Sequence, residues 1–233
     1  MMTLRTAKDR FHTNIDWLDS WHTFSFGHHY DPEHMGFSDL RVINDDVVHG
    51  GGGFATHPHK DMEIITVVLK GALAHKDSLG TGSTIEPGDV QKMSAGSGIR
   101  HSEFNASPTE SVHLLQLWIQ PNVKGVQPAY WQKRFAPEAR QGKFCLVVSP
   151  DEAEGSIPIY QDAKLFVTDL NAGQGLEHKL DTKRNYWLHV ATGGMTANGQ
   201  KLEAGDGLAL TQEKLLGIKA DSESTAILFD LAA

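Results

Sequence analysis

The sequence predicts an all-β protein built from two β-barrels, and two observations support this fold class. Short runs of β-branched and aromatic residues recur along the whole chain, separated by glycine, proline, asparagine and aspartate, whereas helical periodicity is scarce. The two halves of the chain also repeat one order of strands and turns. With 233 residues, the chain can bury a full core in either one large or two modest domains.

The expected strands share high β-propensity and ends marked by turn residues. They are residues 40–44, 63–69, 71–77, 113–119, 144–149, 164–169, 186–191, 207–210 and 226–231. Tight turns are expected at residues 77–80, 86–89 and 204–206, because each contains glycine beside aspartate, serine or proline. Only residues 137–141 and 150–154 indicate short helical turns.

A weak internal repeat predicts that the barrel is duplicated. The first half contains VVLKGALAHKDSLG and then IEPGDVQKMSAG, and the second contains LHVATGGMTANGQ and then KLEAGDGLALTQ. Each copy has an apolar strand, a glycine turn, a polar return strand and a Gly-Asp turn. The strand pattern is interrupted between Pro121 and Phe144. We therefore expect an N-terminal barrel at residues 1–125 and a C-terminal barrel at residues 126–233.

Two pairs of side chains in the first half predict a metal site. His57 and His59 are two residues apart, as are His101 and Glu103. In a strand, residues two apart point to the same face, so two neighbouring strands would bring three imidazoles and a carboxylate together. Nitrogen and oxygen donors with open coordination positions suit iron, manganese, cobalt, nickel or copper acting on a small molecule, rather than structural zinc.

The second half lacks such a pair of histidines. His178 and His189 stand alone and far apart in the sequence. We therefore expect the C-terminal barrel to hold no metal and to serve structure or substrate access.

Two residues compete for the role of acidic ligand. Glu63 has the same strand parity as His57 and His59, but it lies about 13 Å of chain beyond His59 at ~3.3 Å per residue, so it needs strand curvature to reach the metal. Glu103 needs no such bend, because it directly follows His101 on the same face. Geometry favours Glu103 without settling the choice, and Glu63 is then expected either beside the ligands, orienting an imidazole N–H, or at a strand edge in solvent.

Composition limits the classes of partner and the compartment. A net charge of −8 argues against direct nucleic-acid binding, which needs clustered lysine and arginine. No apolar run approaches the ~20 residues that span a bilayer, and the opening MMTLRTAKDR lacks the apolar segment of a secretory signal. Cys145 is the one cysteine, so an internal disulfide is excluded. We expect a cytoplasmic protein that binds neither membrane nor nucleic acid.

The remaining histidines and aromatic residues have weaker signals. His22 is expected either to donate a hydrogen bond beside the pocket or to pack in the core, and His75 and His113 are expected to be satisfied structural imidazoles in strands. A solvated loop is expected to carry His28, His29 and His34. Either an apolar pocket wall or plain core is expected to contain Trp21, Phe24, Phe26, Phe54 and Met62.

The histidine segments resemble the two cupin motifs. The first motif is matched by Gly51, His57, His59, Glu63 and Gly71, with one residue more than usual before Gly71. The second is matched by Gly98, His101 and Asn105, although Gly96 stands where a proline is usual. Together with LDSWHTFSFGHHYDP, LRVINDD and SAGSGIRHSE, these segments are similar to the pirin family of bicupins, from about Leu18 into the second half.

The resemblance implies two antiparallel jelly-roll barrels facing each other, with one divalent transition metal in the N-terminal barrel. The implied ligands are His57, His59, His101 and Glu103. Iron is the first expectation for the metal, with manganese, cobalt, nickel, copper and zinc as alternatives. The resemblance also implies quercetin 2,3-dioxygenase activity, in which a flavonol-like enol reacts with dioxygen and carbon monoxide is released. The alternative is a metal-dependent co-regulator that acts through protein partners.

We expect Glu103 to be the catalytic base. In the expected reaction, the metal lowers the pKa of a bound substrate hydroxyl and Glu103 accepts its proton, after which the electron-rich ring reacts with dioxygen.

Overall fold

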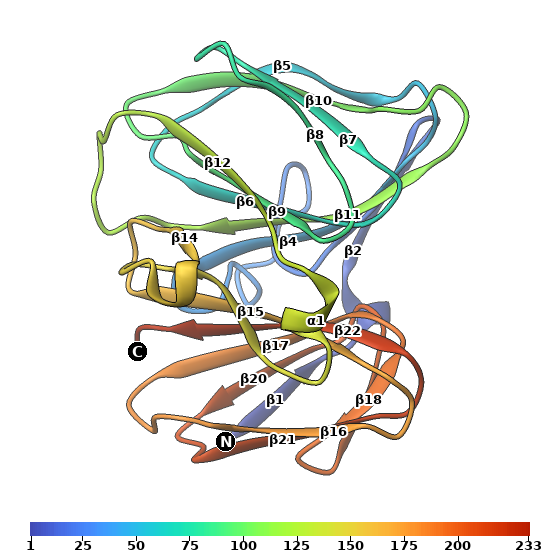
Figure 1. Cartoon of the computed structure of the whole chain (residues 1–233), viewed down its shortest axis with the longest axis vertical. Helices are drawn as coiled ribbons and strands as arrows, with labels where there is room; N and C mark the ends of the chain where they lie inside the picture. Colours follow the sequence, from blue (N-terminus) through green and yellow to red (C-terminus); the bar gives the residue numbers. More distant parts are fainter. The chain divides into compact units, whose positions relative to one another are not determined.

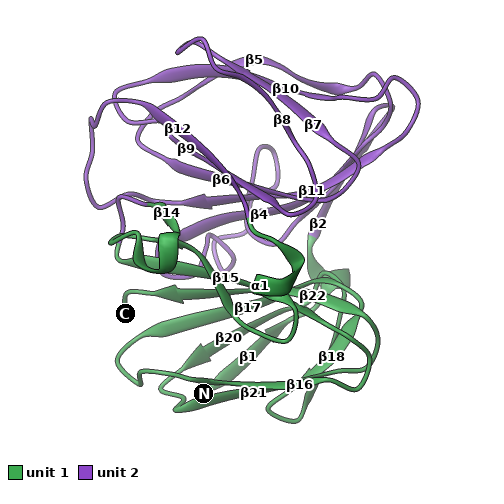
Figure 2. Cartoon of the chain, viewed as in Figure 1, with its two compact units in different colours: residues 1–10, 135–158, 162–233 green, residues 11–134, 159–161 purple.

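The fold is all-β, as expected, and is formed by 22 strands, one four-residue helix and two short 3-10 turns (Figure 1). The computed structural model describes all of residues 1–233. Nearly every strand pair is antiparallel, and the exception is the short pair of β13 and β14. No helix in the chain is long and apolar enough to cross a membrane. The chain divides into two compact units (Figure 2).

The N-terminal unit comprises residues 11–134 and 159–161 and contains two sheets. From edge to edge, the seven-stranded sheet consists of β12 (Ala129–Arg134), β9 (Asp89–Ser94), β6 (Glu63–Lys70), β11 (Val112–Ile119), β4 (Leu40–Val48), β3 (Leu18–His22) and β2 (Phe11–Ile15). The four-stranded sheet consists of β5 (Gly53–His59), β10 (Ile99–Asn105), β7 (Leu73–Asp77) and β8 (Gly82–Ile85).

The interior of the N-terminal unit has apolar side chains at its ends and polar side chains between them. On β6, Ile64 belongs to one apolar cluster and Val68 to another. Because alternate residues of a strand share a face, Thr66 lies between these two clusters, and it is fully buried. Gln116 occupies the corresponding place on β11, two residues from Leu114. The polar band in the middle of the unit carries the candidate site.

The C-terminal unit comprises residues 1–10, 135–158 and 162–233. Its seven-stranded sheet consists of β1 (Met2–Arg5), β20 (Gly207–Thr211), β17 (Asn185–Thr192), β22 (Ser224–Leu231), β15 (Ala163–Leu170), β13 (Cys145–Ser149) and β14 (Ile157–Pro158). Its four-stranded sheet consists of β16 (Gly175–Lys179), β21 (Leu215–Ala220), β18 (Gly194–Ala197) and β19 (Gln200–Glu203). The short helical elements of this unit are η1 (Ala7–Asp9), α1 (Pro137–Arg140) and η2 (Ala153–Gly155).

The two units have the same arrangement of sheets. Each pairs a seven-stranded sheet with a four-stranded sheet, and the strands named by the sequence repeat occupy matching positions: β6, β7 and β9 in one unit, and β17, β18 and β20 in the other. The interiors differ in chemistry. A single cluster of apolar side chains, including Leu188, Met195 and Leu216, fills the C-terminal unit, and the ring of His178 packs against Phe144 and Phe166.

The compact units divide the chain at positions other than the boundary after residue 125. The turn-rich segment beginning at Pro121 leads into β12, and β12 then pairs with β9 of the N-terminal unit. At the other end of the chain, β1 pairs with β20 and belongs to the C-terminal unit. Backbone pairing of strands assigns these residues to units, and turn composition alone does not report that pairing.

Candidate metal centre

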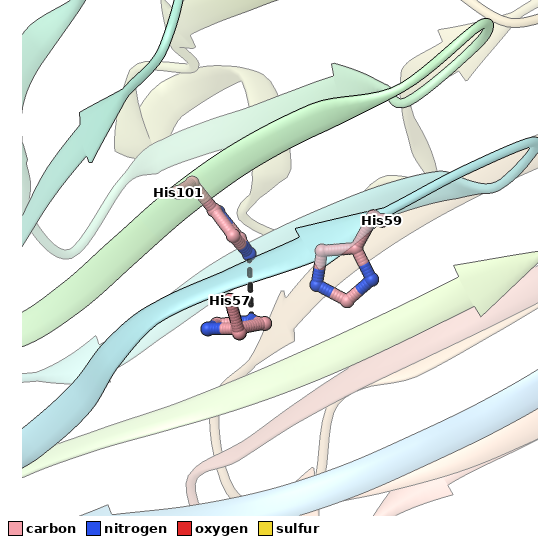
Figure 3. Close-up of side chains that lie close together, drawn as sticks. All are labelled: His57, His59 and His101. Atoms are coloured by element: carbon pink, nitrogen blue, oxygen red, sulfur yellow. Dashed lines mark hydrogen bonds between the residues drawn. The ribbon is translucent and has the colours of Figure 1, made fainter.

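Three histidines meet on two neighbouring strands of the four-stranded sheet. His57 of β5 is directly opposite His101 of β10 in the antiparallel register, and His59 lies two residues further along β5. One ring nitrogen from each histidine lies within 4.8 Å of the others. Figure 3 shows the three side chains converging from the two strands. The two-residue spacing therefore has the geometric consequence expected from the sequence.

The hydrogen bonds of His57 identify the nitrogen that faces this group. Its Nδ1 lies 2.8 Å from the carbonyl oxygen of Ala55, which only accepts hydrogen bonds, so Nδ1 carries the proton. Nε2 then has a free lone pair and lies 3.0 Å from Nε2 of His101. Two nitrogens bound to one ion at ~2.1 Å and at right angles would be roughly 3.0 Å apart. The pair of nitrogens thus fits a shared cation.

The surroundings keep the imidazoles of His59 and His101 neutral, as metal ligands must be. Burial, and to a smaller degree the neighbouring His57, lower the pKa of His59 to about 4. Burial, followed by the imidazoles of His57, His59 and His75, lowers the pKa of His101 to about 2. At neutral pH each of these two rings offers a lone pair, which favours binding of a transition metal.

Glu103 is buried beside His101 but belongs to a second group of potential ligands. A carboxylate oxygen of Glu103 lies within 4.8 Å of ring nitrogens of His75 and His101, with all three residues buried. Between His101 and Glu103, the register of β10 against β5 shifts by one residue, and Glu103 is opposite Phe54. This bulge explains why the carboxylate does not join His57 and His59 in one tight group.

The Glu103 carboxyl is oriented by a chain of side-chain donors. Gln116 Nε2 donates to Glu103 Oε2 at 3.1 Å, and Trp118 Nε1 donates to Gln116 Oε1 at 3.3 Å. Glu103 Oε1 is buried and has no hydrogen-bond partner. Burial, followed by the charge of Asp46, raises the pKa of Glu103 to about 7. The free oxygen is therefore available to a metal or to a proton.

Glu63 is not near the histidines, and both expectations for it were wrong. β5 ends at His59, and Glu63 begins β6 in the other sheet, so the two positions do not share a continuous strand. Ile64 and Thr66 face the interior of the unit, and Glu63 points the other way because it has the opposite strand parity. It is 1% exposed, binds Lys92 Nζ, and accepts a hydrogen bond from Ser94 Oγ at 3.1 Å.

A cavity of about 240 Å³ opens beside the candidate metal ligands, within the N-terminal unit. His57, His59 and Glu103 line one part of it, and the rings of Phe26, Phe54 and Trp118 form apolar parts of the wall. Of the aromatic and apolar residues expected at a pocket, Phe26 and Phe54 line this cavity, whereas Trp21, Phe24 and Met62 do not.

Comparison with known proteins decides the family. The family model Pirin matches residues 4–119, and the model of the quercetinase C-terminal cupin domain matches residues 146–231. A quercetin 2,3-dioxygenase of Escherichia coli is 51% identical over 99% of both chains. The chain belongs to the pirin family. A pirin-like protein of Caulobacter vibrioides is 41% identical over 93% of each chain.

A solved structure extends the similarity to a metal-bound pirin. The bacterial pirin YhhW from Escherichia coli in complex with nickel(II) is 51% identical to this chain, with a TM-score of 0.94 over 100% of this chain and 99% of that one. The expectation of a pirin-type bicupin, made from the residues around His57 and His101, is confirmed.

Several cavity residues of this pirin were not expected from the sequence. His28 and His29 line the cavity, and His28 is also exposed in a turn, as expected for a solvated loop. The loop carrying them folds back because Ser25 N–H donates to the His34 carbonyl oxygen and Phe26 bridges to His29. Neither strand parity nor composition reports such a reversal, although the aromatic residues that precede Gly27 were a possible signal.

A polar patch of the cavity comes from β3 and β4. His22 Nδ1 lies 2.7 Å from Asn44 Oδ1, and its Nε2 lies 2.9 Å from Thr13 Oγ1, so His22 faces the pocket with both nitrogens engaged. Asp46 lines the same cavity and accepts a hydrogen bond from Ser20. Asp46 was missed because an acidic residue inside a β-branched run has no distinctive sequence signal.

The two strand histidines expected to be structural differ from each other. His113 Nε2 pairs with Asp45 Oδ1 at 2.6 Å. His75 Nε2 lies 3.2 Å from Asp77 Oδ2, but its Nδ1 is buried without a hydrogen-bond partner. Burial lowers the pKa of His75 despite the nearby carboxylate of Asp77.

Proposed function

We propose that this pirin is a metal-dependent dioxygenase of the quercetin 2,3-dioxygenase type, acting on a flavonol-like enol. The observation that carries the proposal is the convergence of His57, His59 and His101 at a cavity with aromatic walls. The name of the 51% identical relative supports the same activity. We assign the metal to His57, His59, His101 and Glu103 in the N-terminal unit, and no metal to the apolar interior of the C-terminal unit.

The ligand set has consequences for the substrate. Three neutral imidazoles and one carboxylate leave a divalent ion with a net charge of about +1, which favours an anionic oxygen in an open position. When bound, the metal supplies Lewis acidity that lowers the pKa of a substrate hydroxyl. Iron is our first choice because nitrogen and oxygen donors with open positions suit its reactions with dioxygen. Nickel(II) is the metal in the YhhW complex.

The protein side chains bind the substrate and handle its proton. The rings of Phe26, Phe54 and Trp118 offer apolar surface to a flat ligand and exclude water from it. Glu103 must loosen from the metal to accept the hydroxyl proton on Oε1, where burial raises its pKa to about 7 and Gln116 holds its other oxygen. The reaction therefore needs both the ligand and the base role of Glu103.

The proposal is tested by elemental analysis of the purified protein and by an assay with quercetin under air and under nitrogen. We expect about one metal ion per chain and carbon monoxide release that requires dioxygen. His57→Ala and His101→Ala should each lose most of the metal, whereas His113→Ala, outside the cavity, should keep it. Metal-loaded protein that releases no carbon monoxide would instead favour the co-regulator role, in which a metal-bound form recognises protein partners in the cytoplasm.

Glu103→Gln separates metal binding from proton transfer. The amide retains an oxygen donor but cannot accept the substrate proton, so we expect part of the metal to remain and turnover to fall by about 10²–10⁴-fold. Metal content and carbon monoxide release, measured on one preparation, check this outcome. Turnover equal to that of the unmodified protein would contradict the base role.

A further inference from the structure

A second group of buried side chains lies behind the candidate metal ligands. It consists of His75, His101 and Glu103, and it shares His101 with the group formed with His57 and His59. We propose that Asp77 and His75 act as a positioning pair, which holds His101 in the ring orientation and tautomer that metal binding requires. The inference rests on the proposed metal site, because it concerns the outer nitrogen of one of its ligands.

Asp77 is fixed by the backbone and determines the tautomer of His75. Asp77 Oδ1 accepts hydrogen bonds from the N–H groups of Leu79 at 2.9 Å and Thr81 at 3.0 Å. Asp77 Oδ2 faces His75 Nε2 at 3.2 Å, and both side chains have no exposed surface. A carboxylate accepts, so Nε2 carries the proton of the neutral ring. His75 Nδ1 is therefore left as a buried acceptor.

His101 presents the matching donor. Its Nε2 faces His57 Nε2, which assigns this nitrogen to the cation. Nδ1 must then carry the proton of the neutral ring, and in the structure Nδ1 is buried without a partner. The rings of His75 and His101 have their centroids 5.3 Å apart. One ring nitrogen of His75 lies within 4.8 Å of one of His101, and the proposed hydrogen bond requires the two Nδ1 atoms to come closer than this.

The directions of these bonds form one consistent chain. Asp77 accepts from His75, His75 accepts from His101, and His101 offers its remaining lone pair to the metal. Glu103 Oε1 is the competing acceptor in this group, but it is the oxygen that the proposed metal ligation uses. Metal-bound histidines nearly always donate their second ring N–H to a partner, and for His101 the proposed partner is Nδ1 of His75.

Structural packing alone does not explain the pair. A buried polar atom without a hydrogen bond costs about 1–3 kcal/mol, and His75 Nδ1 is such an atom. The ring of Tyr130 packs 4.9 Å from that of His75. The proposed hydrogen bond from His101 to His75 removes that cost.

Asp77→Asn tests the chain without touching a ligand. The amide oxygen of the new side chain can still accept from Leu79 and Thr81, but its NH₂ group then faces His75 and donates. The proton of His75 moves to Nδ1, where it opposes the N–H of His101. We expect the Kd for cobalt(II), measured in competition with a chelator, to rise about 10–100-fold, and the visible absorption of the cobalt(II) protein to shift.

Two further variants distinguish the role of His75 Nδ1 as a hydrogen-bond acceptor from the packing of the His75 ring. His75→Phe keeps the ring and removes the acceptor, so it should weaken cobalt(II) binding as Asp77→Asn does. His75→Asn places an amide oxygen near the position of Nδ1 and should restore at least part of the affinity. The matched control is Asp45→Asn in the His113–Asp45 pair, which lies outside the cavity and should leave cobalt(II) binding unchanged.

The outcomes distinguish the inference from the proposed function. If His101→Ala binds cobalt(II) normally, the metal site itself is wrong. If His101→Ala loses cobalt(II) while Asp77→Asn and His75→Phe keep the unmodified affinity and spectrum, the positioning pair alone is wrong. Thermal unfolding of the metal-free variants is measured in parallel, and a loss of affinity that matches a general loss of folded protein, with no rescue by His75→Asn, also overturns the positioning role.

Discussion

Lys92 is a buried cation whose charge is satisfied by three kinds of contact. Its side chain has no exposed surface, and its Nζ binds Glu63 and Ser94. The same Nζ lies 4.3 Å from the ring centroid of Trp131 and 5.5 Å from that of Tyr160. Burial lowers the pKa of Lys92, and the carboxylate of Glu63 opposes this shift. Glu63 is thus required by a lysine rather than by a metal.

Glu63→Gln should destabilise the protein by about 3–5 kcal/mol, because it leaves Lys92 buried without its counter-charge. Metal content should not change, since Glu63 is not a ligand. Urea unfolding and elemental analysis check the two statements, and the double variant Glu63→Gln/Lys92→Met should recover part of the stability. A loss of metal in Glu63→Gln with unchanged stability would show that the carboxylate belongs to the metal site after all.

Asp46 gives the stability of the protein a defined dependence on pH. Burial, opposed by the hydrogen bond from Ser20, raises the pKa of Asp46 from 3.8 to about 7. The folded protein therefore binds more protons than the unfolded chain between these values. This contribution to stability is fully present below about pH 4 and is lost as the pH rises through 7.

We expect Asp46→Asn to become more stable relative to the unmodified protein as the pH rises from about 4.5 to about 8, because the amide has no charge to bury. The difference in melting temperature between the two metal-free proteins, measured across this range, is the test. A difference that stays constant with pH would mean that Asp46 has an ordinary pKa.

The residue-scale prediction from sequence succeeded where strand alternation was sufficient. His57 and His59, with His101 on the next strand, come together because side chains two apart share a face. The position of Glu63 depended on a change of sheet after His59, and the role of His75 depended on which strand pairs with β10. Both are long-range pairings, which spacing along the chain does not report.

Gly96 allows the turn between β9 and β10 that leads into His101. It has a φ of 46°, and a Cβ at this position would lie 2.0 Å from the carbonyl oxygen of Val126. That carbonyl accepts a hydrogen bond from Ser97 N–H at 2.8 Å, so it cannot move away without losing this contact. Glycine is needed here for close approach of the backbone as well as for its conformation.

Gly96→Ala should lower the free energy of unfolding by about 2–4 kcal/mol, through left-handed strain plus the clash with Val126. Gly80→Ala is the matched control, because Gly80 has a φ of 89° with nothing within 4 Å of its added Cβ. It should cost only the conformational strain. Chemical denaturation measures both variants, and equal losses would exclude a role for the close approach.

At the scale of elements, the sequence revealed the strands that are apolar on both faces. β6 and β17 are buried along nearly their whole length and appear as largely apolar runs. Strands such as β12 and β16 carry exposed polar residues and few β-branched residues. These strands are held by their neighbours in the sheet, so local propensity gives little sign of them.

At the scale of the whole molecule, one edge strand of each seven-stranded sheet lies in the sequence directly before residues of the other unit. β1 comes before the N-terminal unit but pairs with β20, with Met2 opposite Leu210. β12 comes before the main part of the C-terminal unit but pairs with β9. The duplicated units are therefore interleaved in sequence, and the boundary expected after residue 125 falls before a strand that the N-terminal unit requires.

Removal of residues 1–6 should weaken the C-terminal unit specifically, because it exposes the edge of β20. We expect faster amide exchange in residues 207–211, whereas cobalt(II) affinity, which depends on the other unit, should stay within about two-fold. Exchange measured by mass spectrometry reports both units at once. Equal protection of β20 in the shortened and complete chains would show that β1 contributes nothing to that sheet.

The interleaving also constrains the order in which the two units can be completed during translation. Residues 159–161 belong to the N-terminal unit, and the main-chain N–H of Asn122 donates to the carbonyl oxygen of Tyr160 at 2.8 Å. The N-terminal unit, which contains the three histidines, is thus incomplete until residues 159–161 have been translated. Strand β1, which precedes β20 by about two hundred residues in the sequence, must wait for β20 to be translated before the two can pair.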